Sequence, residues 1–226
     1  MDIHHYLTKN KLELTLAYIP AMTFYNILDE IAVFKEQNPG INIILSEILS
    51  ECHYFQGKGI TEALQNFEYD MAFCDSYAVQ AAKCELIEYC EDELVAVLYR
   101  SHPLASLKKI DLRLLAGETF VLLNESNPTY FLSIDTCKKA GFVPKIFFLG
   151  SRIENVLECI SENMGIGLLM KNFIRISQSD NLVARKIVPT TKRHYVLARA
   201  LRQDYSPASR ELWDYISVIV EKSSKT

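Results

Sequence analysis

The chain has few glycines and prolines, no long apolar run and no excess of positive charge. Its 226 residues include 8 Gly and 7 Pro, and 49% are hydrophobic, which excludes fibrous and low-complexity chains and favours one large or two small globular domains. A membrane helix needs about twenty apolar residues in succession, and no segment approaches that length. Residues 1–11 also lack the apolar centre of a signal peptide. The sequence predicts a cytoplasmic protein without membrane contact.

Charge and cysteine spacing exclude further classes. The chain has 24 Lys and Arg against 28 Asp and Glu, a net charge of −4, and its basic residues are not concentrated. Nucleic-acid binding by this chain itself is therefore not expected. No C-x-x-C motif occurs, so neither a zinc site nor a disulfide framework is indicated. We expect no metal, no cofactor, and reduced, mostly buried thiols at Cys52, Cys74, Cys84, Cys90, Cys137 and Cys159.

The segment from Leu12 to Phe34 changes its hydrophobic period from two to helical. Apolar residues alternate up to Tyr18, Pro20 interrupts, and apolar residues then recur at helical spacing. The pattern predicts a strand, a turn over Pro20 to Thr23 and a helix over 23–35. The first N–H groups of such a helix point over the end of the strand and favour an anion. This turn is the first place to expect a ligand.

The remaining chain continues to alternate strands and helices. In the first part, strands at 41–45 and 69–74 flank a helix near 60–67, which predicts a parallel sheet with right-handed crossovers. Two strand-like runs within 84–100, separated by acidic residues 91–93, are interpreted as the passage out of a first lobe. A short helix at 111–116, capped by Asp111, precedes a second alternation. In this second alternation, the predicted strands are 119–123, 145–149, 165–169 and 182–187, and the predicted helices are 128–140 and 152–163. A strand over 194–201 and a helix from Ser206 follow.

Several short motifs occur in a specific order along the chain. They include the Tyr69-Asp70 pair, His102-Pro-Leu-Ala105, Cys137-Lys-Lys-Ala-Gly-Phe142, Gly165-Ile-Gly167 and Ser206-Pro207. In this order, from about Leu12 to Ile219, the sequence resembles the effector-binding domain of LysR-type transcriptional regulators. The resemblance implies an α/β, two-lobed, type 2 periplasmic-binding-protein-like fold. Each lobe would hold a mixed, mostly parallel sheet flanked by helices, with two crossovers between the lobes.

The resemblance also implies a domain layout and partners. Lobe I would comprise 11–83 plus 194–222 and lobe II 84–193, with 1–10 as a linker remnant and 223–226 as a tail. The winged helix-turn-helix of the family is absent from this chain, so DNA would be bound only through that missing N-terminal domain. Family members pair antiparallel, which implies a homo-dimer or tetramer through helices 23–35 and 152–163.

Candidate effector contacts follow from the fold class. Ligands of two-lobed α/β proteins bind beyond the carboxyl ends of the strands, where the family also places its effector. Several candidates have an alternative interpretation. Thr23 could cap a helix, and Ser50 and Glu51 could be ordinary polar loop residues. Cys74 could pack in the core, and Arg152 could lie on a helix surface. The predicted contacts are Ala21, Met22, Thr23, Ser50, Glu51, Cys74, Asn124, Ser126, Asn127, Thr129, Ser151 and Arg152.

The predicted function is effector sensing for a transcriptional regulator. The polar loops indicate a small anion such as an organic acid, an amino acid or an inorganic anion. The alternatives are a stand-alone solute-binding protein and, with less support, an enzyme. No catalytic residue is assigned, because His53 is the only histidine in a candidate loop and is isolated. A peroxide switch is not expected, since Pro128 stands where peroxide-sensing relatives have a first cysteine, leaving Cys137 without a partner.

Overall fold

The computed structural model describes residues 12–48, 59–177, 179–202 and 204–223. These residues form two compact units. The first unit comprises the described residues up to 91 together with those from 194 onward, and the second comprises 92–193. Strands β4 (Cys84–Tyr99) and β10 (Lys192–Ala200) each belong partly to one unit and partly to the other.

The first unit contains a sheet in the order β2-β1-β3-β10. Strands β1 (Glu13–Tyr18), β2 (Asn42–Glu47) and β3 (Met71–Asp75) are mutually parallel. Strand β10 runs antiparallel to β3. The alternation expected for β1 places Leu14 and Leu16 in the core, where both are almost completely buried. This is the strand-helix-strand arrangement that the hydrophobic periods predict.

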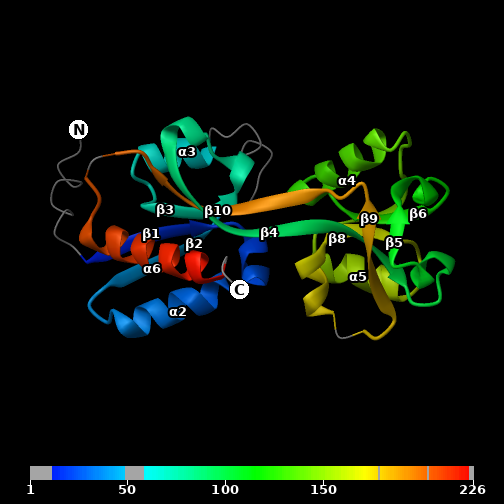
Figure 1. Cartoon of the computed structure of the whole chain (residues 1–226), viewed down its shortest axis with the longest axis horizontal. Coiled ribbons are helices and arrows are strands. Elements are labelled where there is room, and N and C mark those ends of the chain that lie inside the picture. The colour runs from blue at the N-terminus through cyan, green and yellow to red at the C-terminus, as the bar shows by residue number, and fades with distance from the viewer. Residues whose placement is uncertain (1–11, 49–58, 178, 203, 224–226) are drawn as a thin grey trace. The chain divides into compact units, whose positions relative to one another are not determined.

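Three helices cover the sheet of the first unit. Helices α2 (Ile27–Gln37) and α6 (Pro207–Ser223) lie on one face, and α3 (Gly59–Gln65) lies on the other (Figure 1). The Tyr215 hydroxyl on α6 donates to Glu30 Oε2 on α2 over 3.1 Å, and the Tyr215 ring packs against Phe34. Polar and apolar contacts together therefore join α2 to α6.

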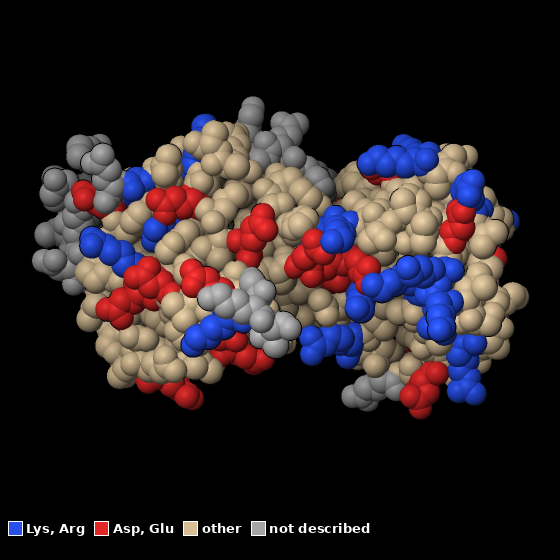
Figure 2. All heavy atoms as spheres, in the orientation of Figure 1, with Lys and Arg blue, Asp and Glu red and all other residues tan. Residues whose placement is uncertain are grey.

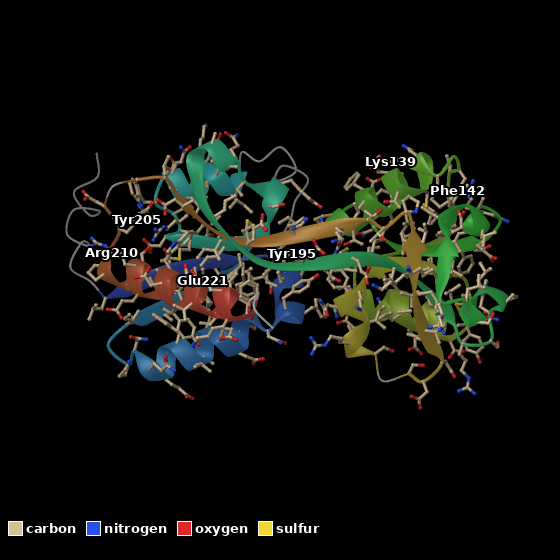
Figure 3. All side chains as sticks on the ribbon, in the orientation of Figure 1. Lys139, Phe142, Tyr195, Tyr205, Arg210 and Glu221 are labelled. Atoms are coloured by element: carbon tan, nitrogen blue, oxygen red, sulfur yellow. The ribbon has the colours of Figure 1, made fainter. Side chains whose placement is uncertain are left out.

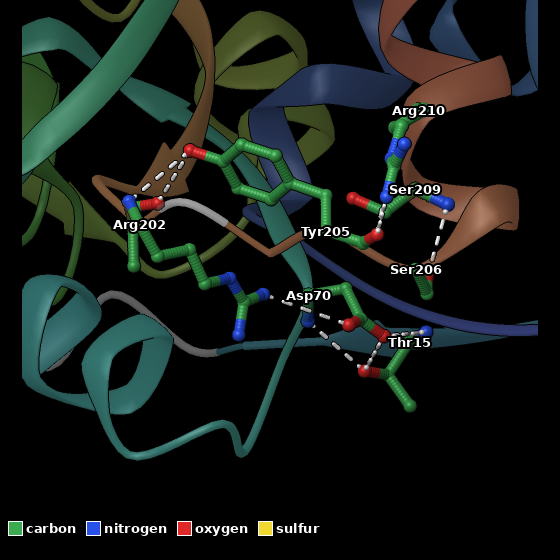
Figure 4. A network of polar contacts seen from close by, with 8 residues as sticks. Thr15, Asp70, Arg202, Tyr205, Ser206, Ser209 and Arg210 are labelled. Atoms are coloured by element: carbon green, nitrogen blue, oxygen red, sulfur yellow. Dashed lines mark hydrogen bonds and ion pairs between the residues drawn. The ribbon is translucent and has the colours of Figure 1, made fainter. Parts of the chain in front are cut away.

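Asp70, which precedes β3, fixes the start of that strand against β1. Its Oδ2 atom accepts hydrogen bonds from both the backbone N–H and the hydroxyl of Thr15, each at 2.9 Å, and its own N–H donates to Thr15 Oγ1. Arg202 Nη2 lies 3.7 Å from Asp70 Oδ1 and completes the network (Figure 4). Asp70 of the Tyr69-Asp70 pair thus has a structural role in this unit.

The helix predicted over 23–35 begins later than expected. Residues Pro20–Tyr25 form a 3-10 helix, Asn26 has a left-handed backbone with φ of 61°, and α2 starts at Ile27. Asparagine tolerates this conformation better than most residues. Apolar spacing continues through the interruption, so periodicity alone did not reveal it.

The second unit is built around β4. Strands β8 (Gly167–Met170) and β9 (Leu182–Val188) pair antiparallel with β4, and β5 (Lys109–Asp111) pairs parallel with β9. Strands β6 (Thr119–Leu123) and β7 (Lys145–Gly150) form a parallel pair. A Cβ atom at Gly165 would lie 2.7 Å from the Thr119 carbonyl oxygen. The close approach of the chain to β6 explains this glycine.

Helix α4 (Pro128–Lys139) ends as the Ala-Gly-Phe motif predicts. Gly141, with φ of 91°, donates to the Lys138 carbonyl, and Phe142 N–H donates to the Cys137 carbonyl. These two bonds define a Schellman motif. The Phe142 ring then packs against Phe120 of β6 (Figure 3). The glycine therefore both stops the helix and directs an aromatic anchor into the unit.

Other elements differ from the predicted boundaries. Residues 84–99 form one continuous strand instead of two, because the acidic interruption is accommodated by hydrogen bonds and ion pairs: Asp92 accepts from Asn172 N–H, and Glu93 pairs with Lys186. The helix expected at 111–116 is a 3-10 turn over Leu112–Leu115, with Asp111 as its cap as predicted. The helix predicted at 152–163 is α5 (Ile153–Ser161).

Candidate functional site

The loop after β1 contains three predicted contacts, and only one is fully exposed. Met22 is buried in the core and Ala21 is partly buried. The exposed Thr23 hydroxyl donates to the Pro20 carbonyl oxygen over 2.9 Å within the 3-10 helix. Because α2 begins at Ile27, Thr23 does not cap that helix. The prediction that the α-helix begins at this turn is therefore wrong. Thr23 nevertheless exposes its side chain to solvent.

Cys74 lies at the end of β3 and is completely buried. Burial raises the pKa of its thiol well above the ordinary value, and the adjacent Asp75 carboxylate raises it further. The neutral thiol packs among core residues, which is the alternative role considered for it. Ser50 and Glu51 lie outside the described residues.

In the second unit, the structure brings two of the predicted loops together. Strands β6 and β7 are parallel neighbours, and Asn124 N–H donates to the Gly150 carbonyl oxygen over 2.8 Å just beyond them. Asn124 Oδ1 accepts from both the N–H and the hydroxyl of Ser126. The polar loop after β6 therefore lies directly beside the loop that contains Ser151.

Asn127 and Thr129 position the start of α4. Asn127 Oδ1 accepts from Thr129 N–H over 2.9 Å, which makes Asn127 the N-cap of the helix. The Thr129 side chain points inward, and its Oγ1 accepts a hydrogen bond from Arg193 Nη1 over 3.1 Å. Since Thr129 is only 1% exposed, it is a structural residue in this unit. A direct effector contact by its side chain is not supported.

The start of α5 carries the remaining two predicted residues. Ser151 and Arg152 are exposed, and Arg152 stands at the N-cap without a side-chain capping bond. The first N–H groups of a helix have no partner within it. Since α4 and α5 follow neighbouring parallel strands, their N-termini lie at the same edge of the β6-β7 pair. That edge can bind an anion through the first N–H groups of α5, which no side chain caps, with Ser151 and Arg152 exposed beside them.

The described residues contain neither a membrane-spanning helix nor a cluster of metal ligands. No helix in these ranges is long and apolar enough to cross a membrane. Likewise, the described part of the chain contains no group of three or more His, Cys, Asp or Glu side chains placed to hold a metal ion.

A pocket that the sequence did not indicate lies elsewhere in the second unit. It has a volume of about 420 Å³ and is lined mainly by basic and apolar residues from β4, β9 and the segment before β5. None of the predicted effector contacts lines it. Its residues come from segments far apart in the chain and form no motif, so no sequence signal could have found it.

Two α/β units that share two strands, with polar loops beyond parallel strands, define the class of two-lobed ligand-binding domains. The chain belongs to the LysR substrate binding domain family, whose model matches residues 9–218. Among curated relatives, the transcriptional dual regulator GltC of Bacillus subtilis (strain 168) is 23% identical over 218 residues. The alignment covers 95% of this chain and 70% of GltC, which is the longer protein.

Solved structures of low sequence identity have the same fold. The regulatory domain of Synechocystis PCC6803 CcmR, in complex with 2-PG, is 20% identical, has a TM-score of 0.77, and the match covers 92% of this chain and 97% of CcmR. The effector binding domain of BenM, with its effector benzoate, is 19% identical with a TM-score of 0.77, covering 95% and 94%. The predicted family and fold class are confirmed. The chain is a LysR-type effector-binding domain.

Proposed function

We propose that this domain binds a small anionic effector between lobe I (11–83 and 194–222) and lobe II (84–193). The observation that carries the proposal is the edge where α4 and α5 begin side by side, locked by the bond from Asn124 N–H to Gly150 O. The first N–H groups of α5, which no side chain caps, the exposed Ser151 and the Arg152 guanidinium suit a carboxylate or phosphate. Benzoate, the BenM effector, is itself a carboxylate.

The effector would act by changing an equilibrium between two arrangements of the lobes. A ligand that contacts both lobes stabilises the arrangement in which both sets of contacts form. In a cytoplasmic regulator, that shift would pass to DNA-binding domains attached N-terminally. The domain itself would be neither an enzyme nor a DNA-binding module. Sequence-specific operator binding by this chain alone at physiological salt would contradict the proposal.

A thermal-shift screen tests effector binding. Small carboxylates, amino acids, sulfate, phosphate and aromatic acids are each added to the protein, and a true effector raises the melting temperature in a concentration-dependent way. At a hundredfold excess over Kd, the stabilisation is about 2.7 kcal/mol. Any hit is repeated on Thr23→Ala and Asn127→Ala, with Asn66→Ala, at an exposed position just after α3, as a matched control. Affinity unchanged in both site variants would contradict the placement of the site.

Self-association through α2 and α5 is the second part of the proposal. Helix α2 exposes Leu28 and Val33, which are 37% and 43% accessible, whereas Ile31 and Phe34 of the same helix are buried in the core. Apolar side chains of this kind are a suitable surface for a second copy. Val33→Glu should shift the protein toward monomer in sedimentation velocity. An unchanged distribution of species would contradict the involvement of α2.

A further inference from the structure

The pocket in the second unit has the size of a small-molecule site. Its volume of about 420 Å³ falls within the usual range of about 300–1,000 Å³ for ligand pockets. Strand β4 provides one wall, β9 another, and the segment between the 3-10 helix Pro103–Ser106 and β5 a third. The lining residues are Glu93, Val95, Ser106, Leu107, Lys108, Lys171, Ala184, Arg185 and Lys186.

The charges around this pocket are strongly unbalanced. It is lined by three lysines and one arginine, against a single carboxylate. Glu93 Oε1 lies 3.0 Å from Lys186 Nζ and 3.7 Å from Lys171 Nζ, so two ammonium groups share one partner. The Glu93 side chain is 16% exposed, whereas both lysines are more than half exposed. The carboxylate therefore holds the two lysines together without neutralising both.

Lys108 adds an ammonium group that has no such partner. Throughout the described ranges, Lys108 makes no ion pair or hydrogen bond through its side chain. The loop that carries it is held in place by Arg185, whose Nε donates to the Ala105 carbonyl over 2.8 Å. A positive charge is thus presented from an anchored segment beside the pair formed by Lys171 and Lys186.

The same region is basic at the molecular surface. Lys and Arg side chains gather over the part of the second unit that contains β5 and β9 (Figure 2). Across β4 and β9, Val95 pairs with Lys186, and Val97 pairs with Ala184. Val95, Ala184 and Leu107 supply an apolar wall next to the charged one. A concave site with one apolar and one cationic side fits a compact organic anion better than a flat nucleic-acid backbone.

We propose that this pocket is a second ligand site, specific for a small molecule with two or more negative charges, either phosphorylated or polycarboxylic. It is independent of the effector site, because none of its lining residues belongs to the loops at the start of α4 and α5. Two charges on one ligand would contact Lys108 and the Lys171–Lys186 pair together. A monoanion would compete with Glu93 for one lysine and gain little.

Isothermal titration calorimetry with inorganic pyrophosphate and with citrate tests the proposal. Ionic strength is kept constant with chloride so that general screening cancels. Lys108→Gln and Lys186→Gln should each weaken binding of the favoured probe about threefold to tenfold, since each removes one charge contact. Lys145→Gln, an exposed lysine at the start of β7 outside the pocket, is the matched control and should change affinity less than about twofold. The stronger of the two probes identifies phosphate or carboxylate as the preferred chemistry.

A gain of affinity gives a sharper test. Glu93→Gln keeps the size of the side chain and frees both lysines, so the probe should bind about threefold more tightly. Asn127→Ala, at the start of α4, should leave this binding unchanged. If neither pyrophosphate nor citrate bound, the proposal would be overturned. So would equal losses in Lys145→Gln, weaker binding by Glu93→Gln, or dependence on Asn127.

Discussion

Arg193 donates a buried hydrogen bond from Nη1 to Thr129 Oγ1 over 3.1 Å, and the two residues are 2% and 1% exposed. The bond connects the start of β10 with the first turn of α4. A guanidinium and a hydroxyl meet in the interior of the second unit, although 64 positions separate them. Thr129 therefore supports the candidate effector loop from beneath it, without belonging to the loop surface.

Replacing Thr129 by valine should destabilise the protein. The substitution keeps the side-chain shape but leaves a charged donor without its buried acceptor, which costs about 1–3 kcal/mol of unfolding free energy. Urea denaturation measures the difference. Thr129→Ser retains the acceptor and should lose much less. If the valine variant were as stable as the wild type, the Arg193 bond would have no net stabilising role.

Features that depend only on neighbouring residues could be predicted from the sequence. The Asp111 cap, Pro128 at the start of α4 and the Gly141 stop all follow from local backbone chemistry, and the structure contains each of them. The interruption of the helix at Asn26 was not predicted, because the apolar spacing continues across it. A single left-handed residue leaves no trace in hydrophobic periodicity.

The candidate site was less accessible to such reasoning. Asn124 and Ser151 follow consecutive strands of a predicted parallel alternation, so their proximity could be predicted. The inward direction of the Thr129 side chain could not be predicted, because its partner Arg193 lies 64 positions away in the sequence. The basic pocket depends on the antiparallel pairing of β4 with β9, which brings Glu93 close to Lys186, and on the segment before β5, which adds Lys108. No short motif encodes this arrangement.

Asp111 should make stability depend on pH in the acid range. Hydrogen bonds from the Arg113 side chain and backbone lower the pKa of the Asp111 carboxyl from 3.8 to about 2. A pKa below the unfolded value means that the interaction stabilises the protein above about pH 4 and is lost as the pH falls toward 2. In urea titrations, the stability difference between wild type and Asp111→Asn should shrink over that interval. Asp180→Asn serves as the control, and a difference that stayed constant would contradict the assignment.

Buried cysteines should resist alkylation and peroxide. Burial raises the pKa of the Cys137 thiol to about 12 and that of Cys74 well above its usual value, so almost no reactive thiolate exists near neutrality. Brief iodoacetamide treatment followed by mass spectrometry should label the partly exposed Cys90 and Cys159 before Cys74 and Cys137. Urea should abolish the difference. Labelling of Cys137 as fast as Cys159 in the native protein would contradict its position in the core.

Asn127→Asp separates the capping role of this side chain from a role in effector binding. Aspartate caps a helix as well as asparagine does and favours the positive end of the dipole, so unfolding free energy should change by less than about 0.5 kcal/mol. The added negative charge lies at the edge where α4 and α5 begin, and it should weaken binding of an anionic effector about tenfold. Asn66→Asp, at an exposed position just after α3, adds the same charge far from this edge in the sequence and should change effector affinity little.

Titration calorimetry with the effector found by thermal shift measures the affinity of both variants. Equal affinities for Asn127→Asp and the wild type would show that the anion binds away from the start of α4, even if the domain is a sensor.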